Sequence, residues 1–257
     1  MSRFTLYSIP VVISLILILF PVINPGTINV NADACGEYCE CKHQCSEIIA
    51  NNALVQIPAQ PMNTWSNIAF LVVGLMALRR RKGPAARWFA ISCTVLCLGS
   101  AAFHSFLTVA GQRWDVIGMF FVFNFLAVYA MFVMHESAKN KEHELRWFRI
   151  AVLLSAIVSV VMAIFVVDLD STKVLAIASA FIIGHLILAV LEKTATLKEV
   201  LLVLSPFAVA FTFRQLDVNG TLCDPASWFQ GHALWHVFAA WGIYEIYKLL
   251  DVIRHER

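Results

Sequence analysis

Charged residues are scarce in this sequence. Asp, Glu, Lys and Arg make up 14% of its 257 residues, whereas soluble globular domains carry about 25%. Together with 60% hydrophobic residues and a mean hydropathy of +0.74, this scarcity argues against an ordinary soluble domain and indicates a membrane protein. The net charge is only +2, so the charge balance indicates neither a nucleic acid nor an acidic partner.

The sequence also lacks the alternation of polar and apolar residues over about ten positions that marks transmembrane β-strands. It has no internal repeat and no low-complexity tract. What it does contain is a series of apolar segments close to the roughly 20 residues that a helix needs to cross a bilayer. They are residues 6–23, 64–78, 88–107, 116–134, 148–167, 174–191, 200–213 and 232–250. We therefore predict an all-α, polytopic membrane protein, in which an N-terminal hydrophobic helix precedes a bundle of seven transmembrane helices.

Basic residues are unevenly distributed among the connections between these segments. Those that follow the first, third, fifth and seventh core helices are Arg79, Arg80, Arg81, Lys82, Arg87, Lys139, Lys141, Arg146, Arg149, Lys193, Lys198, Arg254 and Arg257. The alternate connections contain only Arg113, Lys173 and Arg214. Because cytoplasmic loops are enriched in Lys and Arg, we predict a cytoplasmic C-terminus and a first core helix that enters from the extracytoplasmic side.

Three regions follow from this pattern. Residues 1–24 are either a signal anchor or a cleaved signal peptide, and both interpretations stay open. Arg3 precedes the apolar run, and Ala32-Asp33-Ala34 has the small-x-small pattern of a cleavage site. Residues 25–63 form an extracytoplasmic segment that contains cysteines, and residues 64–257 form the seven-helix domain.

Cysteines are concentrated in the extracytoplasmic segment, which contains Cys35, Cys39, Cys41 and Cys45. Cys223 lies on the outer loop before the last helix. A zinc knuckle is one interpretation of such a cluster, but on the oxidising side of a membrane we expect disulfides, with their connectivity left open. Cys93 and Cys97 lie inside the second core helix and are expected to be small packing residues.

Ionisable residues at membrane depth are costly and tend to be functional. Ser100 and His104 lie four residues apart at the end of the second core helix. Asp115 lies at the first turn of the third, and His232 and His236 form an i, i+4 pair at the start of the seventh. The second core helix is predicted to run outward and the third and seventh inward. All five side chains are therefore expected at one depth near the extracytoplasmic face.

Three histidines at one level, two of them with helical chelate spacing, suit tetrahedral Zn²⁺ with water in the open position. Such a metal lowers the pKa of its bound water to about 7 and polarises a carbonyl group. Each residue also has a structural interpretation: the histidines as packing groups, Asp115 as a helix cap, and Ser100 as a small residue for close helix approach. The residue pattern alone leaves both interpretations open. His185 lies mid-helix, away from this layer, and is expected to be a hydrogen-bonded core residue.

The motifs taken together resemble those of the alkaline ceramidases, whose superfamily also includes the adiponectin receptors. Asn63-Thr64-Trp65-Ser66-Asn67 is similar to the NTxSN element of that family, and Ser100, His104 and Asp115 are similar to its second element. Three stretches of this chain are similar to the final element of the family: Arg214-Gln215-Leu216-Asp217, Cys223-Asp224-Pro225 and Gln230-Gly231-His232-Ala233-Leu234-Trp235-His236. The resemblance runs from about Glu37 to Tyr247.

The resemblance implies Zn²⁺ bound by His104, His232 and His236. It also implies that Asp115 orients or deprotonates the attacking water and that Ser100 stabilises the oxyanion. The implied reaction is hydrolysis of the N-acyl bond of ceramide or a related lipid amide to a fatty acid and a sphingoid base. The expected partners are this lipid and the bilayer, with no nucleic acid.

One segment departs from the family pattern. Ceramidases of the animal type bind Ca²⁺ before the first core helix, through an acidic run and a later Glu. Here the run is Glu37-Tyr38-Cys39-Glu40-Cys41-Lys42, in which Lys42 replaces a ligand, and Gln60 stands where the later Glu is expected. Glu37 and Glu40 remain candidate calcium ligands, with disulfides as the alternative means of fastening this segment.

Two other functions compete with the zinc-dependent amidase. The first is a non-catalytic lipid-binding receptor with seven helices and a structural zinc site. The second is a transporter or proton channel, which would need polar residues through the membrane, whereas most mid-helix positions here are apolar. The sequence predicts neither the natural lipid nor the oligomeric state.

Overall fold

The computed structural model describes residues 38–41, 58–135, 141–165 and 171–256. The predicted N-terminal helix lies outside these residues, as do Cys35, Glu37 and Cys45. Within the described residues the chain is helical and forms no β-strand, which confirms the all-α prediction.

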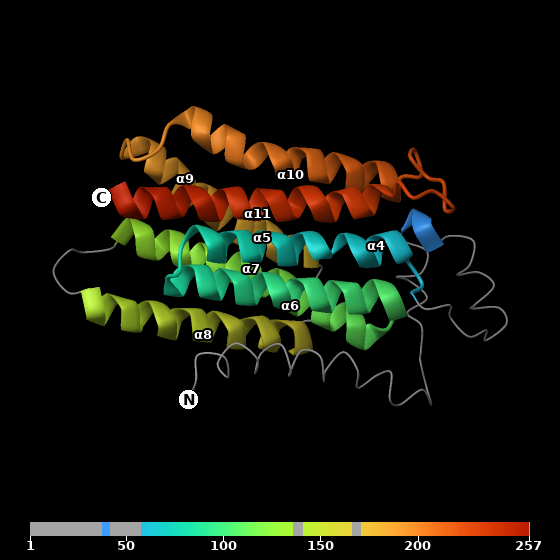
Figure 1. The fold of residues 1–257 in the computed structure, drawn as a ribbon, viewed down its shortest axis with the longest axis horizontal. Helices are drawn as coiled ribbons and strands as arrows, with labels where there is room; N and C mark the ends of the chain where they lie inside the picture. Colours follow the sequence, from blue (N-terminus) through green and yellow to red (C-terminus); the bar gives the residue numbers. More distant parts are fainter. Residues whose placement is uncertain (1–37, 42–57, 136–140, 166–170, 257) are drawn as a thin grey trace.

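The core of the protein is a bundle of long helices packed side by side (Figure 1). Two helices, α4 and α5, adjoin at Asn67 and form one span, Pro61–Arg80. The described elements are η1 (Cys39–Cys41), α4 (Pro61–Ser66), α5 (Ile68–Arg80), α6 (Pro84–Phe106), α7 (Val109–His135), α8 (Lys141–Phe165), α9 (Ser171–Leu191), α10 (Leu197–Val218) and α11 (Gly231–Glu256). With α4 and α5 taken as one, the helices from α4 to α11 match the seven predicted core helices.

The difference from the predicted boundaries that matters most for the site is the start of α7. We expected Asp115 in its first turn, but α7 begins at Val109 and Asp115 lies a turn further along. Leu107 ends α6 in a left-handed conformation, and the Thr108 hydroxyl then accepts the N–H of Gly111, as an N-cap does. The polar residues after Thr108, which resemble a loop in the sequence, are therefore helical.

Helix α10 is also longer than its apolar run. Thr196 and Glu199 form a capping box at its start, which stabilises a polar first turn. At its other end the helix continues to Val218, so Arg214 lies within α10 and not in a loop. Arg113 and Lys173 likewise lie inside α7 and α9.

Four described spans are long and apolar enough to cross a membrane: Pro61–Arg80, Pro84–Phe106, Val109–Val133 and Leu197–Val218. Helices α8 and α9 contribute shorter apolar stretches, Phe148–Val161 and Ile182–Leu191. Large apolar side chains such as Leu154, Ile157 and Leu201 are exposed on the outside of the bundle, as lipid-facing residues are. These features indicate a membrane protein.

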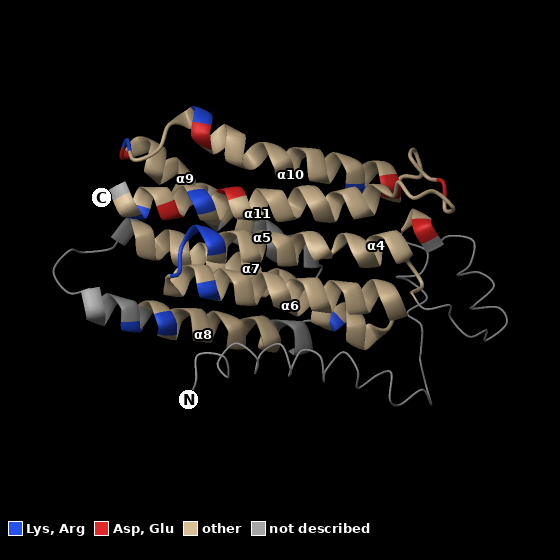
Figure 2. Cartoon of the chain, viewed as in Figure 1, with Lys and Arg blue, Asp and Glu red and all other residues tan. Residues whose placement is uncertain are grey.

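Few charged residues lie in the middle of the bundle (Figure 2), and one of them is Glu245, about halfway along α11. Most Lys and Arg residues of the described chain lie at one end, where α5 and α11 finish and α6 and α8 begin. The opposite end contains the start of α4, the end of α6 and the start of α11. The two ends of the bundle therefore differ in chemistry.

Helices α6 and α7 pack with their backbones close together. A Cβ atom at Gly99 would lie 2.4 Å from the carbonyl oxygen of Trp114, and one at Gly118 would lie 2.5 Å from the Cα of Leu96. Small residues permit this approach, which supplies much of the packing between membrane helices.

Gly118→Ala should therefore destabilise the protein, because its methyl group meets backbone atoms that cannot move aside. Overpacking costs about 1–3 kcal/mol, which outweighs the gain of up to about 1 kcal/mol from the better helix propensity of alanine. Gly184→Ala on α9 is the matched control, because a Cβ there meets nothing within 4 Å. Thermal unfolding in detergent should show a lower Tm for the first variant only. Equal Tm values would contradict the close approach of α6 and α7.

Candidate metal centre

Three histidines converge at the end of the bundle opposite the basic residues. His104 comes from the last turns of α6, and His232 and His236 come from the first turns of α11. One ligand nitrogen from each lies within 4.8 Å of the others. Their side chains are almost fully buried, with exposed fractions of 1%, 5% and 3%.

The course of the chain explains this convergence. Helix α6 ends where α11 begins, and the i, i+4 spacing sets His232 and His236 on one face of α11. The segment before α4 then packs on the end of α6. The N–H of Ala59 bonds the carbonyl of Ser105, and the N–H of Gln60 bonds the carbonyl of His104, each at 3.0 Å. These bonds satisfy carbonyl groups that a helix end leaves unpaired.

Each of two histidines has one ring nitrogen held by a neighbouring side chain. Nδ1 of His104 lies 2.6 Å from Oε1 of Gln60, and Nδ1 of His236 lies 2.8 Å from Oγ of Ser66. The Gln60 oxygen can only accept, so His104 donates from Nδ1 and carries its lone pair on Nε2. Metal-bound histidines are characteristically oriented by such second hydrogen bonds.

Two buried ring nitrogens have no hydrogen-bond partner among the described residues: Nε2 of His104 and Nδ1 of His232. Buried polar atoms of this kind are normally satisfied. A cation shared by the three imidazoles would satisfy both, and neutral imidazole nitrogens are good ligands for Zn²⁺. His104, His232 and His236 therefore fit a metal ion such as Zn²⁺.

The carboxylate of Asp217, in the last turn of α10, connects α11 with η1. Its Oδ1 accepts the N–H of His232 and its Oδ2 accepts the N–H of Cys39, both at 3.2 Å. Cys39 also forms a disulfide with Cys223. Residues 38–41 are thereby joined to the connection before α11 by the disulfide and to the start of α11 by the shared carboxylate.

This disulfide supplies a pairing that the sequence left open. Cys93 and Cys97 are free and buried in α6, as expected. Next to Cys39, the ring of Tyr38 packs against His232 and His104, with centroid distances of 4.1 and 5.5 Å. Tyr38 is itself buried and covers the histidines on the side of the outer segment.

Glu40, a candidate calcium ligand, caps helix α4 in this structure. Its two carboxylate oxygens accept the N–H groups of Met62 and Asn63. Burial raises the pKa of Glu40 above its ordinary value, the two N–H bonds lower it in part, and the charge of Asp217 adds to the increase. Glu37 lies outside the described residues, so the calcium site stays a prediction.

Ser100 and Asp115 are brought together across the interface of α6 and α7. The Ser100 side chain lies close enough to the Asp115 carboxylate to interact with it. Ser100 is buried and lies one turn before His104 on the same helix, so the pair lies one turn away along α6 from the histidines. His185 is half-buried on α9, outside this group.

The sequence did not predict the residues that orient the histidines. In the sequence Gln60 stands out only as a departure from a calcium site, yet its side chain bonds a histidine 44 residues away in the chain. Ser66 and Asp217 belong to the motifs that resemble the family, but their spacing does not predict these contacts. The motifs mark the two residues as notable, and only the folded structure shows that they contact His236 and His232.

Comparison with known families gives one match. A family model described as Ceramidase matches residues 31–257, which is most of the chain. No curated protein matches it.

Gln60 provides a direct test of the metal centre. Gln60→Leu keeps the approximate size of the side chain but removes the acceptor for His104, and loss of such a partner costs about 10–100-fold in metal affinity. Gln60→Glu is the matched control, because its carboxylate still accepts from Nδ1. Zinc analysis of the purified variants under competing chelator should show loss in the first and retention in the second. Full retention in Gln60→Leu would show that this contact does not orient a ligand.

Proposed function

This chain belongs to the ceramidase family, and we propose that it is a zinc-dependent membrane amidase. Its proposed reaction is hydrolysis of the N-acyl bond of ceramide or a related lipid amide to a fatty acid and a sphingoid base. The family implies a hydrolase that acts on amide bonds. Zinc, the residue roles and the lipid are our own inferences.

The observation that carries the proposal is the cluster of three buried histidines with two unpartnered nitrogens. His104, His232 and His236 would hold the metal. When bound there, Zn²⁺ supplies a Lewis acid for the amide carbonyl and acidifies water.

The chain's own residues account for the proton movements. Water adds to the carbonyl carbon, and the Asp115 carboxylate accepts the proton that the water releases. The Ser100 hydroxyl donates a hydrogen bond to the carbonyl oxygen as negative charge develops on it. When the C–N bond breaks, Asp115 returns its proton to the amine nitrogen, so the carboxylate is ready for another turnover.

The contact between Ser100 and Asp115 supports these roles. Because the Ser100 side chain lies beside the Asp115 carboxylate, the proposed donor and the proposed base are close together before substrate binds. Ser100 then directs its hydroxyl to the substrate oxygen. A lipid-binding receptor with a structural zinc would need neither residue at this position.

The proposed orientation brings the histidines near the extracytoplasmic face and the C-terminus to the cytoplasm. Exposed aromatic residues lie at the same end as the histidines: Trp228 and Phe229 are 82% and 78% exposed on the connection into α11. Such rings prefer the interface between lipid and water. This location suits a substrate whose amide lies close to the headgroup level of the bilayer.

Asp115→Asn and Ser100→Ala separate chemistry from metal binding. Neither residue is a proposed ligand, so both variants should keep their zinc. Asparagine cannot accept a proton, so turnover should fall at least about 100-fold, and loss of an oxyanion donor should cost about 10²–10³-fold. His232→Ala should instead lose both zinc and turnover, whereas His185→Ala should keep both.

These outcomes require zinc content, ceramide affinity and fatty-acid release for each purified variant. Near-normal turnover in Asp115→Asn would remove its role as the base, and loss of zinc there would make it a ligand. A wild-type protein that binds zinc and ceramide but releases no fatty acid would be a receptor.

A further inference from the structure

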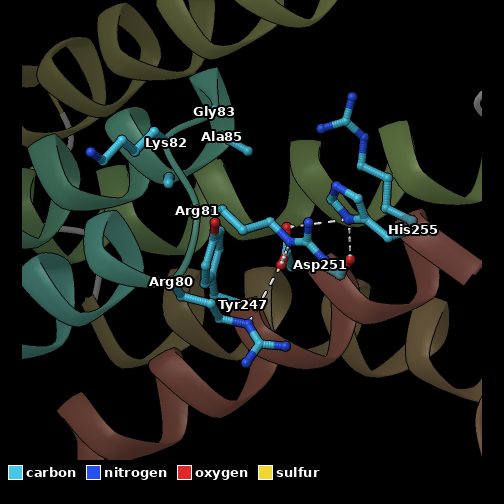
Figure 3. A pocket seen from close by; sticks show the side chains of 10 residues that line it. Arg80, Arg81, Lys82, Gly83, Ala85, Tyr247, Asp251 and His255 are labelled. Atoms are coloured by element: carbon cyan, nitrogen blue, oxygen red, sulfur yellow. Dashed lines mark hydrogen bonds and ion pairs between the residues drawn. The ribbon is translucent and has the colours of Figure 1, made fainter.

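A second site lies at the opposite end of the bundle from the histidines. There a pocket of about 370 Å³ opens between the end of α5, the start of α6 and the end of α11 (Figure 3). Its lining residues are Arg80, Arg81, Lys82, Gly83, Ala85, Ala86, Tyr247, Asp251, Arg254 and His255. The metal centre and the reaction proposed above use none of them.

Positive charge is in excess in this pocket. Four side chains that are charged at neutral pH, Arg80, Arg81, Lys82 and Arg254, line it together with a single carboxylate, that of Asp251. Among the lining residues, basic side chains therefore outnumber the single carboxylate. Like charges held close together repel one another, and an anion bound among them relieves the repulsion.

Asp251 forms ion pairs with two of the arginines but occupies only some of their N–H donors. Its carboxylate is buried, and its Oδ2 lies 2.8 Å from Nε of Arg81 and 3.6 Å from Nε of Arg80. Its Oδ1 accepts the hydroxyl of Tyr129 at 3.4 Å. A guanidinium has five N–H donors, so one shared carboxylate oxygen leaves most donors of both arginines for another acceptor. Figure 3 shows the Arg81 side chain directed at Asp251, whereas Arg80 meets Asp251 through Nε and its terminal nitrogens point away.

The start of α6 adds donors on the same side. Helix α6 begins at Pro84, and Gly83 before it supplies no side-chain cap. Ala85 and Ala86, in the first turn, line the pocket. The N–H groups of a first helical turn have no partner within the helix, and they carry the positive end of the helix dipole. Both features favour an anion such as phosphate.

The depth of the pocket identifies the source of that anion. Arg80 ends the membrane span Pro61–Arg80, and Pro84 begins the span Pro84–Phe106. The pocket thus lies where two apolar spans leave the bilayer, at the level of lipid headgroups. Basic pockets between membrane helices at this level bind anionic headgroups. The volume is too small for an acyl chain in addition, so the chains would stay in the bilayer.

We propose that this pocket binds the phosphate of an anionic phospholipid in the leaflet at this end of the bundle, the cytoplasmic leaflet in the predicted orientation. The phosphate is held by Arg80 and Lys82, with the N-terminal turn of α6 beneath it. Asp251 is a positioning residue that holds the two arginines. The bound lipid connects α5 and α6 to α11, the helix that carries two of the histidines at its other end.

The test compares lipid binding to the full-length protein in a neutral detergent, measured by native mass spectrometry with phosphatidylglycerol or phosphatidylcholine. The pocket variant combines Arg80→Gln with Lys82→Gln and leaves the Arg81–Asp251 pair intact. The matched control combines Arg146→Gln with Arg149→Gln, two exposed residues of α8 at the same end that do not line the pocket. Both variants lose two positive charges.

Wild-type protein should retain phosphatidylglycerol in preference to phosphatidylcholine. Two basic side chains near an anionic headgroup together contribute roughly 30-fold in affinity, so the pocket variant should lose about that much. The control should stay close to wild type. Lys82→Gln alone should lose part of the affinity. Because Lys82 is exposed, this single variant can be tested in place of the double variant if the latter does not fold.

Three results would overturn the proposal. The first is equal retention of the two lipids by the wild type. The second is an equal loss in the pocket variant and the α8 control, which would make the effect one of general surface charge. In the third, millimolar inorganic phosphate binds in place of the lipid, so that the ligand is a free anion and not a headgroup.

Discussion

The interior of a helical bundle has no water to satisfy a polar atom, and this constraint governs the arrangement around the three histidines. Within the described part of the chain, Nε2 of His104 and Nδ1 of His232 are buried without a partner, which costs roughly 1–3 kcal/mol for each such group. A metal ion that accepted both lone pairs, together with one from His236, would convert this cost into binding energy. The helix ends and the oriented side chains around the site hold the three rings where such an ion could bind them.

The surrounding contacts are consistent with a site built before any metal binds. Gln60 and Ser66 orient two of the rings from the segment that precedes and forms α4, and Asp217 holds the start of α11 from the end of α10. The disulfide between Cys39 and Cys223 keeps the outer segment in contact with the same region. Residues far apart in the sequence thus fix the histidines from several sides, which is the rigidity that catalysis by a positioned metal and base requires.

Much of this arrangement could be predicted from residue patterns. Apolar run lengths predicted the helices, and helix direction with i, i+4 spacing predicted that His104, His232 and His236 would approach one another, although their role as ligands stays a prediction. The start of α7 was wrong because the Thr108 cap makes a polar stretch helical. Gln60, Ser66 and Asp217 were missed because their partners lie 44, 170 and 15 residues away, where no local periodicity connects them.

The central claim is that a zinc ion bound by the three histidines hydrolyses a lipid amide, and reversible metal removal tests it most directly. Purified wild-type protein is stripped with a chelator and then titrated with Zn²⁺ while fatty-acid release from ceramide is measured. The account predicts loss of activity on stripping and full recovery at one zinc ion per chain. Amide hydrolysis that persists in metal-free protein, or stoichiometric zinc binding that restores none, would contradict it.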